Sequence, residues 1–194
     1  MIPWLPMREA SKSRALETPR LILRRFTLDD APFILELVND PAWLEHIGDR
    51  NVRTLGDARS YLTKGTLAMY EREGFGMLAV TLKDSAELVG TCGLIKRDGL
   101  EDVDIGFAFL PQYRGQGFAL ESAEAVLDHG TTVLGLKRIV AIVSGANHRS
   151  IRILEKIGLR FERMVRLPGD EEEIALYAFS RPLEGGTRTG VVNT

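Results

Sequence analysis

Two glycines between an apolar strand and an apolar-striped helix constrain the fold of this chain more than any other feature. Residues 103–110 form an apolar run typical of a strand, and the apolar positions of residues 119–127 recur near the helical period of 3.6. Gly115 and Gly117 fall at the junction. Glycine lets the backbone approach a ligand closely, and the start of a helix adds partial positive charge and outward N–H groups. This stretch therefore predicts a phosphate-binding turn.

The residues that follow the second glycine argue against two common phosphate loops. A P-loop needs Lys and then Ser or Thr, whereas Phe118-Ala119 follows Gly117. A dinucleotide fingerprint needs a third glycine where Leu120 stands. Nucleoside triphosphate hydrolysis and dinucleotide binding are therefore unsupported, and the pattern Gln112-x-x-Gly115-x-Gly117 remains.

Periodicity and turn residues predict a mixed α/β (α+β) chain with helices on the faces of a sheet. A helix separates the strand at residues 138–143 from the strand before the glycines, so the two are expected to run parallel. Residues 42–53 are interpreted as an irregular connection. The seven expected strands are residues 21–26, 77–82, 88–95, 103–110, 138–143, 161–166 and 174–179, with short helices after residue 28, at 57–70 and at 147–157.

Length and charge limit the domain organisation and the partners. A chain of 194 residues with 44% hydrophobic residues predicts one globular domain, placed at residues 18–182. Residues 1–17 are interpreted as a flexible arm and residues 183–194 as a disordered tail. The formal net charge of -2 gives no overall basic field for direct binding to nucleic acid or to an anionic membrane.

Cysteine and histidine usage indicate the compartment and the absence of a metal site. Cys92 is the single cysteine, which excludes an internal disulfide and fits a reducing cytoplasm. The sequence has no apolar run long enough to span a bilayer. His46, His129 and His148 lack the spacing of metal ligands, so no metal site is expected.

The glycine pattern and the predicted strand order resemble the GNAT N-acetyltransferase superfamily, whose pyrophosphate loop reads Gln/Arg-x-x-Gly-x-Gly/Ala. The resemblance covers roughly residues 17–182 and implies the GNAT fold, with splayed central strands in a mostly antiparallel sheet. Within it, four motifs are similar to the RimJ/RimL-like ribosomal-protein N-terminal acetyltransferase branch: Thr18 to Arg24, Ile105-Gly106-Phe107, Gly117 to Glu121, and Asn147-x-x-Ser150-x-Arg152-x-Leu154-Glu155-Lys156-x-Gly158.

The resemblance implies acetyl-CoA as the co-substrate, without a metal. Backbone N–H groups of residues 114–119 would bind its pyrophosphate, and the pantetheine arm would lie between the splayed strands. The cofactor-binding residues that it implies are Phe109, Leu110, Gln112, Arg114, Gly115, Gln116, Gly117, Phe118, Ala119, Asn147 and Ser150.

The resemblance also implies roles in acetyl transfer. Asp104 precedes Ile105-Gly106-Phe107, where related enzymes often carry a carboxylate, so it is the expected general base; a solvated strand residue is the alternative, and Glu101 and Asp102 lie nearby. Many members place a tyrosine acid where this chain has Leu154. Ser150 is therefore expected near the CoA sulfur and Asn147 on the pantetheine arm, although both also fit a helix cap. Tyr177 is a weaker alternative acid.

Four residues are expected to line the acceptor pocket: Trp43, His46, Asp104 and Glu121. Trp43 and His46 could instead anchor a loop. Glu121 lies in the first turn of a helix, where the dipole favours an acid in any case. The acidic run Asp170 to Glu173 is interpreted as a solvated hairpin tip.

These observations predict an acetyl-CoA-dependent N-acetyltransferase that moves an acetyl group to a primary amine by direct attack in a ternary complex. The expected acceptor is the N-terminal α-amino group of a protein or a small amine, and a homodimer would fit this branch. A non-catalytic acyl-CoA-binding sensor or interaction module is the alternative, because the usual tyrosine is absent.

Overall fold

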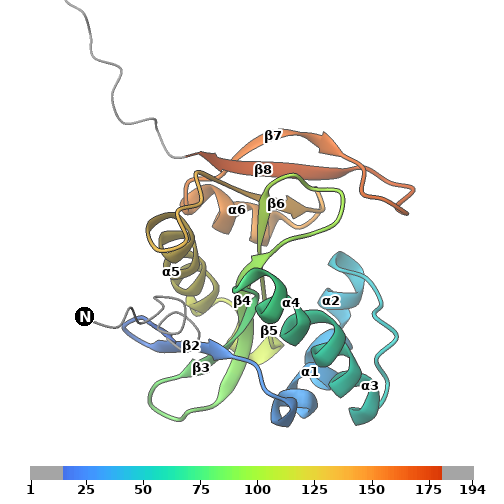
Figure 1. Ribbon diagram of the computed structural model, residues 1–194, viewed down its shortest axis with the longest axis vertical. Coiled ribbons are helices and arrows are strands. Elements are labelled where there is room, and N and C mark those ends of the chain that lie inside the picture. The colour runs from blue at the N-terminus through green and yellow to red at the C-terminus, as the bar shows by residue number, and fades with distance from the viewer. Residues whose placement is uncertain (1–14, 181–194) are drawn as a thin grey trace, which may run out of the picture.

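The computed structural model describes residues 15–180 and shows one eight-stranded sheet with the order β1-β2-β3-β4-β5-β6-β8-β7 (Figure 1). Neighbouring strands are antiparallel except β5 and β6. Residues 1–14 of the expected arm, residues 181–182 of the expected domain and the whole expected tail, 183–194, lie outside the described residues. The strands are β1 Leu16–Glu17, β2 Leu21–Arg25, β3 Met77–Leu82, β4 Leu88–Ile95, β5 Val103–Phe109, β6 Arg138–Val143, β7 Arg160–Val165 and β8 Ile174–Ser180.

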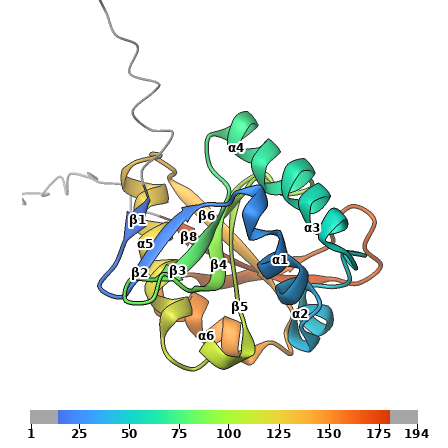
Figure 2. The same cartoon turned by 90° about the horizontal axis from the view of Figure 1, so that it is seen from below.

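Helices cover both faces of this sheet, as the sequence predicts (Figure 2). On one face α5 and α6 pack over the larger core, and on the other α1 and α3 pack over a second core. Adjacent Ala79 and Val80 belong to different cores because side chains alternate along a strand. The helices are η1 Leu28–Asp30, α1 Ala31–Val38, α2 Pro41–His46, α3 Leu55–Tyr61, η2 Leu62–Leu67, α4 Ala68–Glu73, η3 Pro111–Tyr113, α5 Phe118–Thr132 and α6 His148–Lys156.

The parallel strands β5 and β6 pair only at their beginnings. Val103 lies opposite Ile139 and Asp104 opposite Val140. Beyond these pairs, β5 stays with β4 as far as Phe109, while β6 stays with β8. Each strand follows its outer neighbour, and the accumulated twist separates the two. The facing edges of residues 105–109 and 141–143 are therefore not paired with each other, which confirms the predicted splay.

Two local predictions are wrong in detail. Leu16–Glu17 pairs with β2, which makes an eighth strand inside the segment expected to be a loose arm. The segment expected to be an irregular connection begins with α2, because Asp40 accepts hydrogen bonds from the N–H groups of Ala42 and Trp43 and Pro41 occupies the first turn. Asp followed by Pro is a helix-start signal as well as a helix-end signal.

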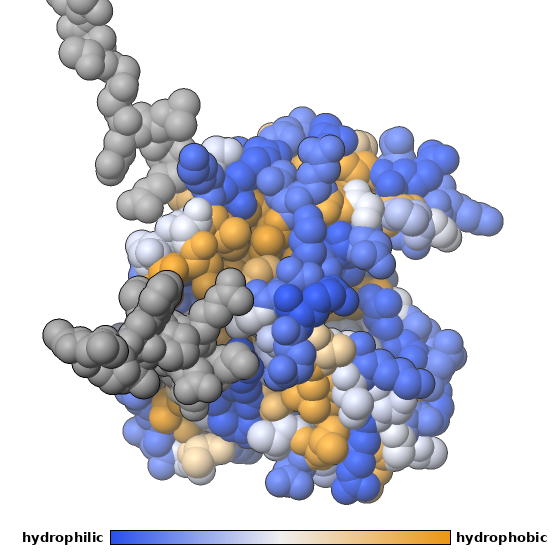
Figure 3. Space-filling view, in the orientation of Figure 1, coloured by the Kyte–Doolittle hydropathy of each residue, from blue (hydrophilic) through white to orange (hydrophobic). Residues whose placement is uncertain are grey.

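In Figure 3, hydrophilic residues make up most of the outline of the molecule, and apolar residues form patches between them. Within residues 15–180, no helix has the length and apolar character needed to cross a membrane.

Candidate functional site

The glycine loop, residues 110–120, presents a row of unused backbone donors. Gly115 and Gly117 have φ of +78° and +84°, the left-handed region in which a side chain is strained. The first bond of α5 runs from the N–H of Glu121 to the carbonyl of Gly117. Within the described part of the chain, the N–H groups of residues 115–120 have no hydrogen-bond acceptor. A turn that ends in the N-terminus of a 15-residue helix is a good anion site.

The space in front of Gly115 is open. A Cβ added there would meet no atom within 4 Å, whereas one added at Gly117 would come within 3.2 Å of the guanidinium of Arg20. The loop therefore fits a pyrophosphate that approaches the backbone at Gly115, with a cation close by. The structure explains why both positions are glycine: one leaves room for a ligand and the other leaves room for Arg20.

Arg114 braces the loop instead of reaching outward. Its Nε donates to the carbonyl of Phe109 at 2.8 Å, and its Nη2 donates to the buried carboxylate of Asp40. Asp40 also caps α2, so one arginine joins the end of β5, the loop and α2. The backbone N–H of Arg114 donates to the carbonyl of Pro111 at 3.2 Å, so it is not among the unused donors of the loop, contrary to the predicted use of Arg114 in cofactor binding.

Glu121 braces the other side of the loop. Its carboxylate accepts hydrogen bonds from the hydroxyl of Thr18 at 2.5 Å and from the backbone N–H and Nε of Arg20 at 2.9 and 2.7 Å. Burial alone would raise the pKa of Glu121, but these bonds lower it below its usual value. Arg20 in turn donates to the carbonyl of Gln116 and lies over the ring of Phe118. Glu121 thus faces the turn between β1 and β2, away from α2.

Asp104 is buried at the last residue of β5 that pairs with β6, just before the two strands separate. Its side chain is 2% exposed, and Nε and Nη2 of Arg97 donate to its carboxylate at 3.0 and 2.7 Å. Burial raises the pKa of Asp104 to about 6, although Arg97 and the backbone N–H of Ile142 both act to lower it. The alternative of a solvated strand residue is excluded. A carboxylate that titrates near neutrality beside an open strand edge is suited to proton transfer.

Asn147 caps α6, as the capping interpretation predicts, and still has donors to offer. Its Oδ1 accepts a hydrogen bond from the N–H of Ser150 at 3.1 Å. Within residues 15–180, neither its Nδ2 nor the hydroxyl of half-buried Ser150 has a partner. The cap therefore fixes the start of α6 and leaves two polar groups free. Tyr177 is buried in the larger core against Phe161, which leaves it poorly placed to serve as an acid.

Trp43 and His46 lie on α2, beside the braced end of the loop. Trp43 is half-buried against the second core, and its indole N–H is buried without an acceptor among the described residues. His46 is half-buried in the last turn of the helix. Through Asp40 and Arg114, α2 is tied directly to the glycine loop.

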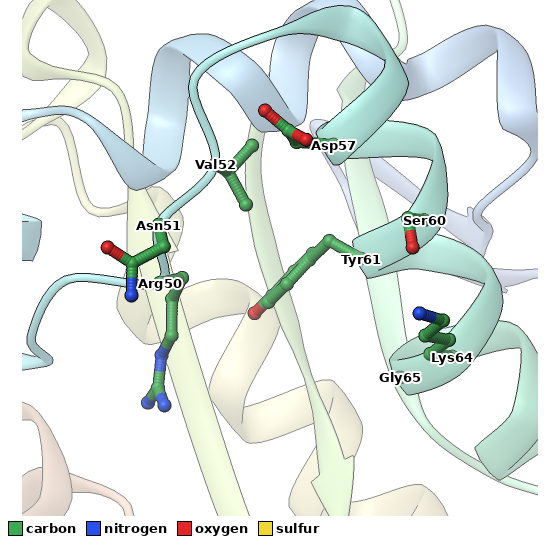
Figure 4. A pocket seen from close by; sticks show the side chains of 8 residues that line it. All are labelled: Arg50, Asn51, Val52, Asp57, Ser60, Tyr61, Lys64 and Gly65. Atoms are coloured by element: carbon green, nitrogen blue, oxygen red, sulfur yellow. The ribbon is translucent and has the colours of Figure 1, made fainter.

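An open cavity of about 460 Å³ lies between the segment after α2 and α3 (Figure 4). Its polar lining consists of Arg50, Asn51, Asp57, Ser60, Tyr61 and Lys64. Sequence reasoning missed this site, because its residues belong to a loop and a helix that show only ordinary patterns. Among residues 15–180, no group of three or more His, Cys, Asp or Glu side chains could hold a metal ion.

Sequence reasoning also missed Arg20, Asp40 and Arg97. Each pairs with a residue that was predicted to be functional, across 101, 74 and 7 positions of sequence respectively. Only the short separation between Arg97 and Asp104, which flank one hairpin turn, could have suggested a pair.

Comparison with known proteins agrees with this geometry. The acetyltransferase (GNAT) domain family matches residues 20–160. An uncharacterized N-acetyltransferase of Bacillus subtilis, YnaD, is 31% identical over 147 residues, which cover 76% of this chain and 83% of YnaD.

Solved structures show the same fold. A GNAT-family acetyltransferase from Bacillus anthracis has a TM-score of 0.71 at 29% identity, covering 86% of this chain and 98% of that one. A RimL ribosomal-protein alpha-N-acetyltransferase in complex with coenzyme A has a TM-score of 0.73 at 19% identity, with the same two coverages. The glycine loop, the splayed strands and a family match over most of the chain lead to one conclusion: this chain belongs to the GNAT acetyltransferase family.

Proposed function

We propose that this chain transfers the acetyl group of acetyl-CoA to a primary amine, by direct attack while both substrates are bound. The observation that carries the proposal is the glycine loop, where the N–H groups of residues 115–120 are unpaired within the described residues and lie at the start of α5. The loop directly follows β5, the strand that separates from β6.

The donor site fits acetyl-CoA in two parts. The pyrophosphate would accept hydrogen bonds from the loop, where Gly115 leaves open space and Arg20 adds a cation. The pantetheine arm would follow the unpaired edge of β5, with the free amide nitrogen of Asn147 as a further donor. Acetyl-CoA supplies an acetyl group activated by its thioester.

Asp104 is the proposed base. An N-terminal α-amino group has a pKa of about 7.7 to 8.0, so it is partly deprotonated near neutral pH and needs little help from a base. A carboxylate with a pKa of about 6 can supply that help. Above that pH Asp104 is mostly ionised and can accept the proton as the new C–N bond forms. Arg97 holds the carboxylate in place.

Ser150 is the proposed proton donor to the sulfur as the C–S bond breaks. Its hydroxyl has no competing hydrogen bond within the described residues. Negative charge that develops on the acetyl oxygen would be stabilised by a backbone N–H on the open edge of β5, near Phe107 to Phe109, because the N–H of Leu110 already donates to the carbonyl of Val89 at 3.1 Å. One such donor is typically worth about 10²–10³ in rate.

The acceptor that we propose is the N-terminal α-amino group of a protein or peptide, as in the RimJ/RimL-like branch. Support comes from the motifs shared with that branch and from the fold shared with a RimL alpha-N-acetyltransferase. The family resemblance alone leaves small amines as the second class of acceptor.

Two measurements test the proposal. Calorimetry should show binding of acetyl-CoA but not of ATP or NAD. Release of CoA thiol should then appear with N-terminal peptides or with a small amine. Binding without release for every amine would favour a non-catalytic acyl-CoA-binding module, and absence of acetyl-CoA binding would contradict the donor site itself.

A further inference from the structure

The cavity beside α3 is rich in cationic groups that have no carboxylate partner. Arg50 enters it from the loop and Lys64 from the helix, on opposite sides (Figure 4). Within the described residues, the guanidinium of Arg50 makes only a long bond of 3.4 Å to the carbonyl of Ile47, and Lys64 makes no hydrogen bond or ion pair. By contrast, Arg20, Arg97 and Arg114, the arginines beside the glycine loop and Asp104, each pair with a carboxylate.

The one carboxylate in the cavity lining is already engaged. Asp57 accepts hydrogen bonds from the backbone N–H groups of Arg53 and Thr54 at 3.1 and 2.9 Å, as part of the cap of α3. These bonds lower the pKa of Asp57, so its carboxylate is ionised, but it is occupied by the N–H groups at the start of α3. It therefore cannot neutralise both Arg50 and Lys64.

The neutral side chains of the cavity add further donors. Tyr61 points from α3 toward Arg50, and its hydroxyl has no hydrogen-bond partner among the described residues (Figure 4). The hydroxyl of Ser60 and the side-chain amide of Asn51 also have no hydrogen-bond partner among the described residues. A cavity that offers two cations and several unused donors is complementary to a group that only accepts hydrogen bonds and carries negative charge.

The local backbone is specialised for this lining. Lys64 lies in η2, a π-helical segment that interrupts the run from α3 to α4, and such segments often occur at functional sites. Asn51 has φ of +55°, a left-handed conformation that is uncommon for a residue with a side chain. Two irregularities therefore face each other across one cavity.

One cation, Arg97, influences both the cavity residue Tyr61 and the proposed base Asp104. Burial raises the pKa of its hydroxyl, and Arg50 and Arg97 both act electrostatically to lower it. Arg97 is the residue that holds Asp104. Arg97 therefore acts both on the proposed base and on a residue that lines the cavity.

We propose that this cavity binds an anionic oxygen group of the acceptor, so that the enzyme prefers amines that also carry a carboxylate. The inference rests on the proposed acetyl transfer and names the class of acceptor. The carboxylate can come from an acidic side chain next to a peptide N-terminus or from a free amino acid, since both place it a few bonds from the amine. Polyamines, which carry only positive charge, would be repelled.

The experiment compares three peptides that differ only at the second residue: Ser-Glu, Ser-Gln and Ser-Lys, each followed by the same neutral sequence. Glutamate and glutamine share a shape, so their difference reports charge. We expect kcat/KM to be about tenfold higher for the Glu peptide than for the Gln peptide, as for one charge-assisted hydrogen bond, and lowest for the Lys peptide. Free serine and spermidine complete the panel and separate the two sources of carboxylate from a polycation.

The variant Arg50→Gln/Lys64→Gln should reduce the Glu-to-Gln ratio to near one. Arg59→Gln is the matched control: it removes a cation from the exposed face of the same helix, outside the cavity lining, and should keep the ratio. Calorimetric binding of the Glu peptide is measured separately from transfer, and we expect the double variant to weaken it.

The two proposals can fail separately. Transfer without any preference for the Glu peptide, or a preference that survives the double variant, would overturn the inference and leave the acetyltransferase intact. Charge-dependent binding of the Glu peptide without transfer would support the anion site and contradict the proposed function.

Discussion

The glycine loop and the cavity beside α3 serve the two proposed substrates, and they are built from different parts of the chain. The loop uses backbone N–H groups of one continuous segment, made accessible by Gly115 and Gly117. The cavity uses side chains, among them Arg50 and Lys64, that come from a loop and a helix. A backbone site recognises a group common to many ligands, whereas a side-chain site can change with few substitutions. Such a division would let one fold keep its donor while the acceptor changes.

Asp104 lies near the start of β5, the strand that leads to the glycine loop, and its replacement should have the largest effect. Asp104→Asn should reduce kcat by about 10²–10⁴, the usual contribution of a general base. In the wild type the rate should rise as the pH passes about 6, because the carboxyl then loses its proton. Asparagine cannot titrate, so the variant should lack this limb in a pH–rate profile.

Arg97→Gln supplies the control for that profile. Arg97 acts to lower the pKa of Asp104, so its removal should raise that pKa and move the limb to higher pH. A loss of rate in Asp104→Asn that is the same at every pH would show that Asp104 only positions other groups.

Gly115→Leu tests the loop as a phosphate site. A Cβ added there meets no atom within 4 Å, so besides the strain of the positive φ the main clash would be with the ligand. We expect the affinity for acetyl-CoA to fall by about 100-fold, or about 2.7 kcal/mol, in a calorimetric titration. Gly135→Leu is the matched control, since Gly135 also has positive φ and open space.

Equal losses of acetyl-CoA affinity in these two variants would indicate backbone strain instead of a steric block. Gly117→Trp should also abolish acetyl-CoA binding, but it is less clean, because a side chain there presses on Arg20.

Arg114→Lys tests whether acetyl-CoA binding by the loop depends on the bridge that Arg114 makes between Phe109 and Asp40. Lysine keeps the charge but cannot bridge Phe109 and Asp40 with one planar group. We expect acetyl-CoA affinity to fall by about tenfold, as for one charge-assisted bond. Arg59→Lys, on an exposed surface of α3, should leave the affinity unchanged. Full affinity in Arg114→Lys would show that the glycines alone hold the loop.

Ser150→Ala should have the smallest effect, a decrease in kcat of a few-fold to about tenfold, because the CoA thiol is a good leaving group and water can protonate it. The hydroxyl makes no hydrogen bond within the described residues, so thermal stability should not change. Asn147→Ala is the contrast, since loss of the cap typically costs about 1 kcal/mol of stability. An unchanged kcat in Ser150→Ala would exclude the proton-donor role.

The sequence alone was sufficient for the order of most elements and for the position of the glycine loop. The periodic spacing of hydrophobic residues predicted most strands and helices, and the glycine pair with its flanking strand and helix identified the loop. These signals are local, because backbone conformation depends on neighbouring residues. The missed features, β1 and α2, are short, and short elements carry few periodic positions.

Tertiary structure alone decided which side chains meet. It buried Asp104 against Arg97, turned Arg114 back to Asp40 and left Arg50 and Lys64 without carboxylate partners among the described residues. Charge pairing, burial and pKa depend on distances between residues that are remote in sequence, and no periodic pattern encodes those distances. The glycine loop could therefore be predicted from sequence, whereas the cavity that we propose for the acceptor had to be found in the fold.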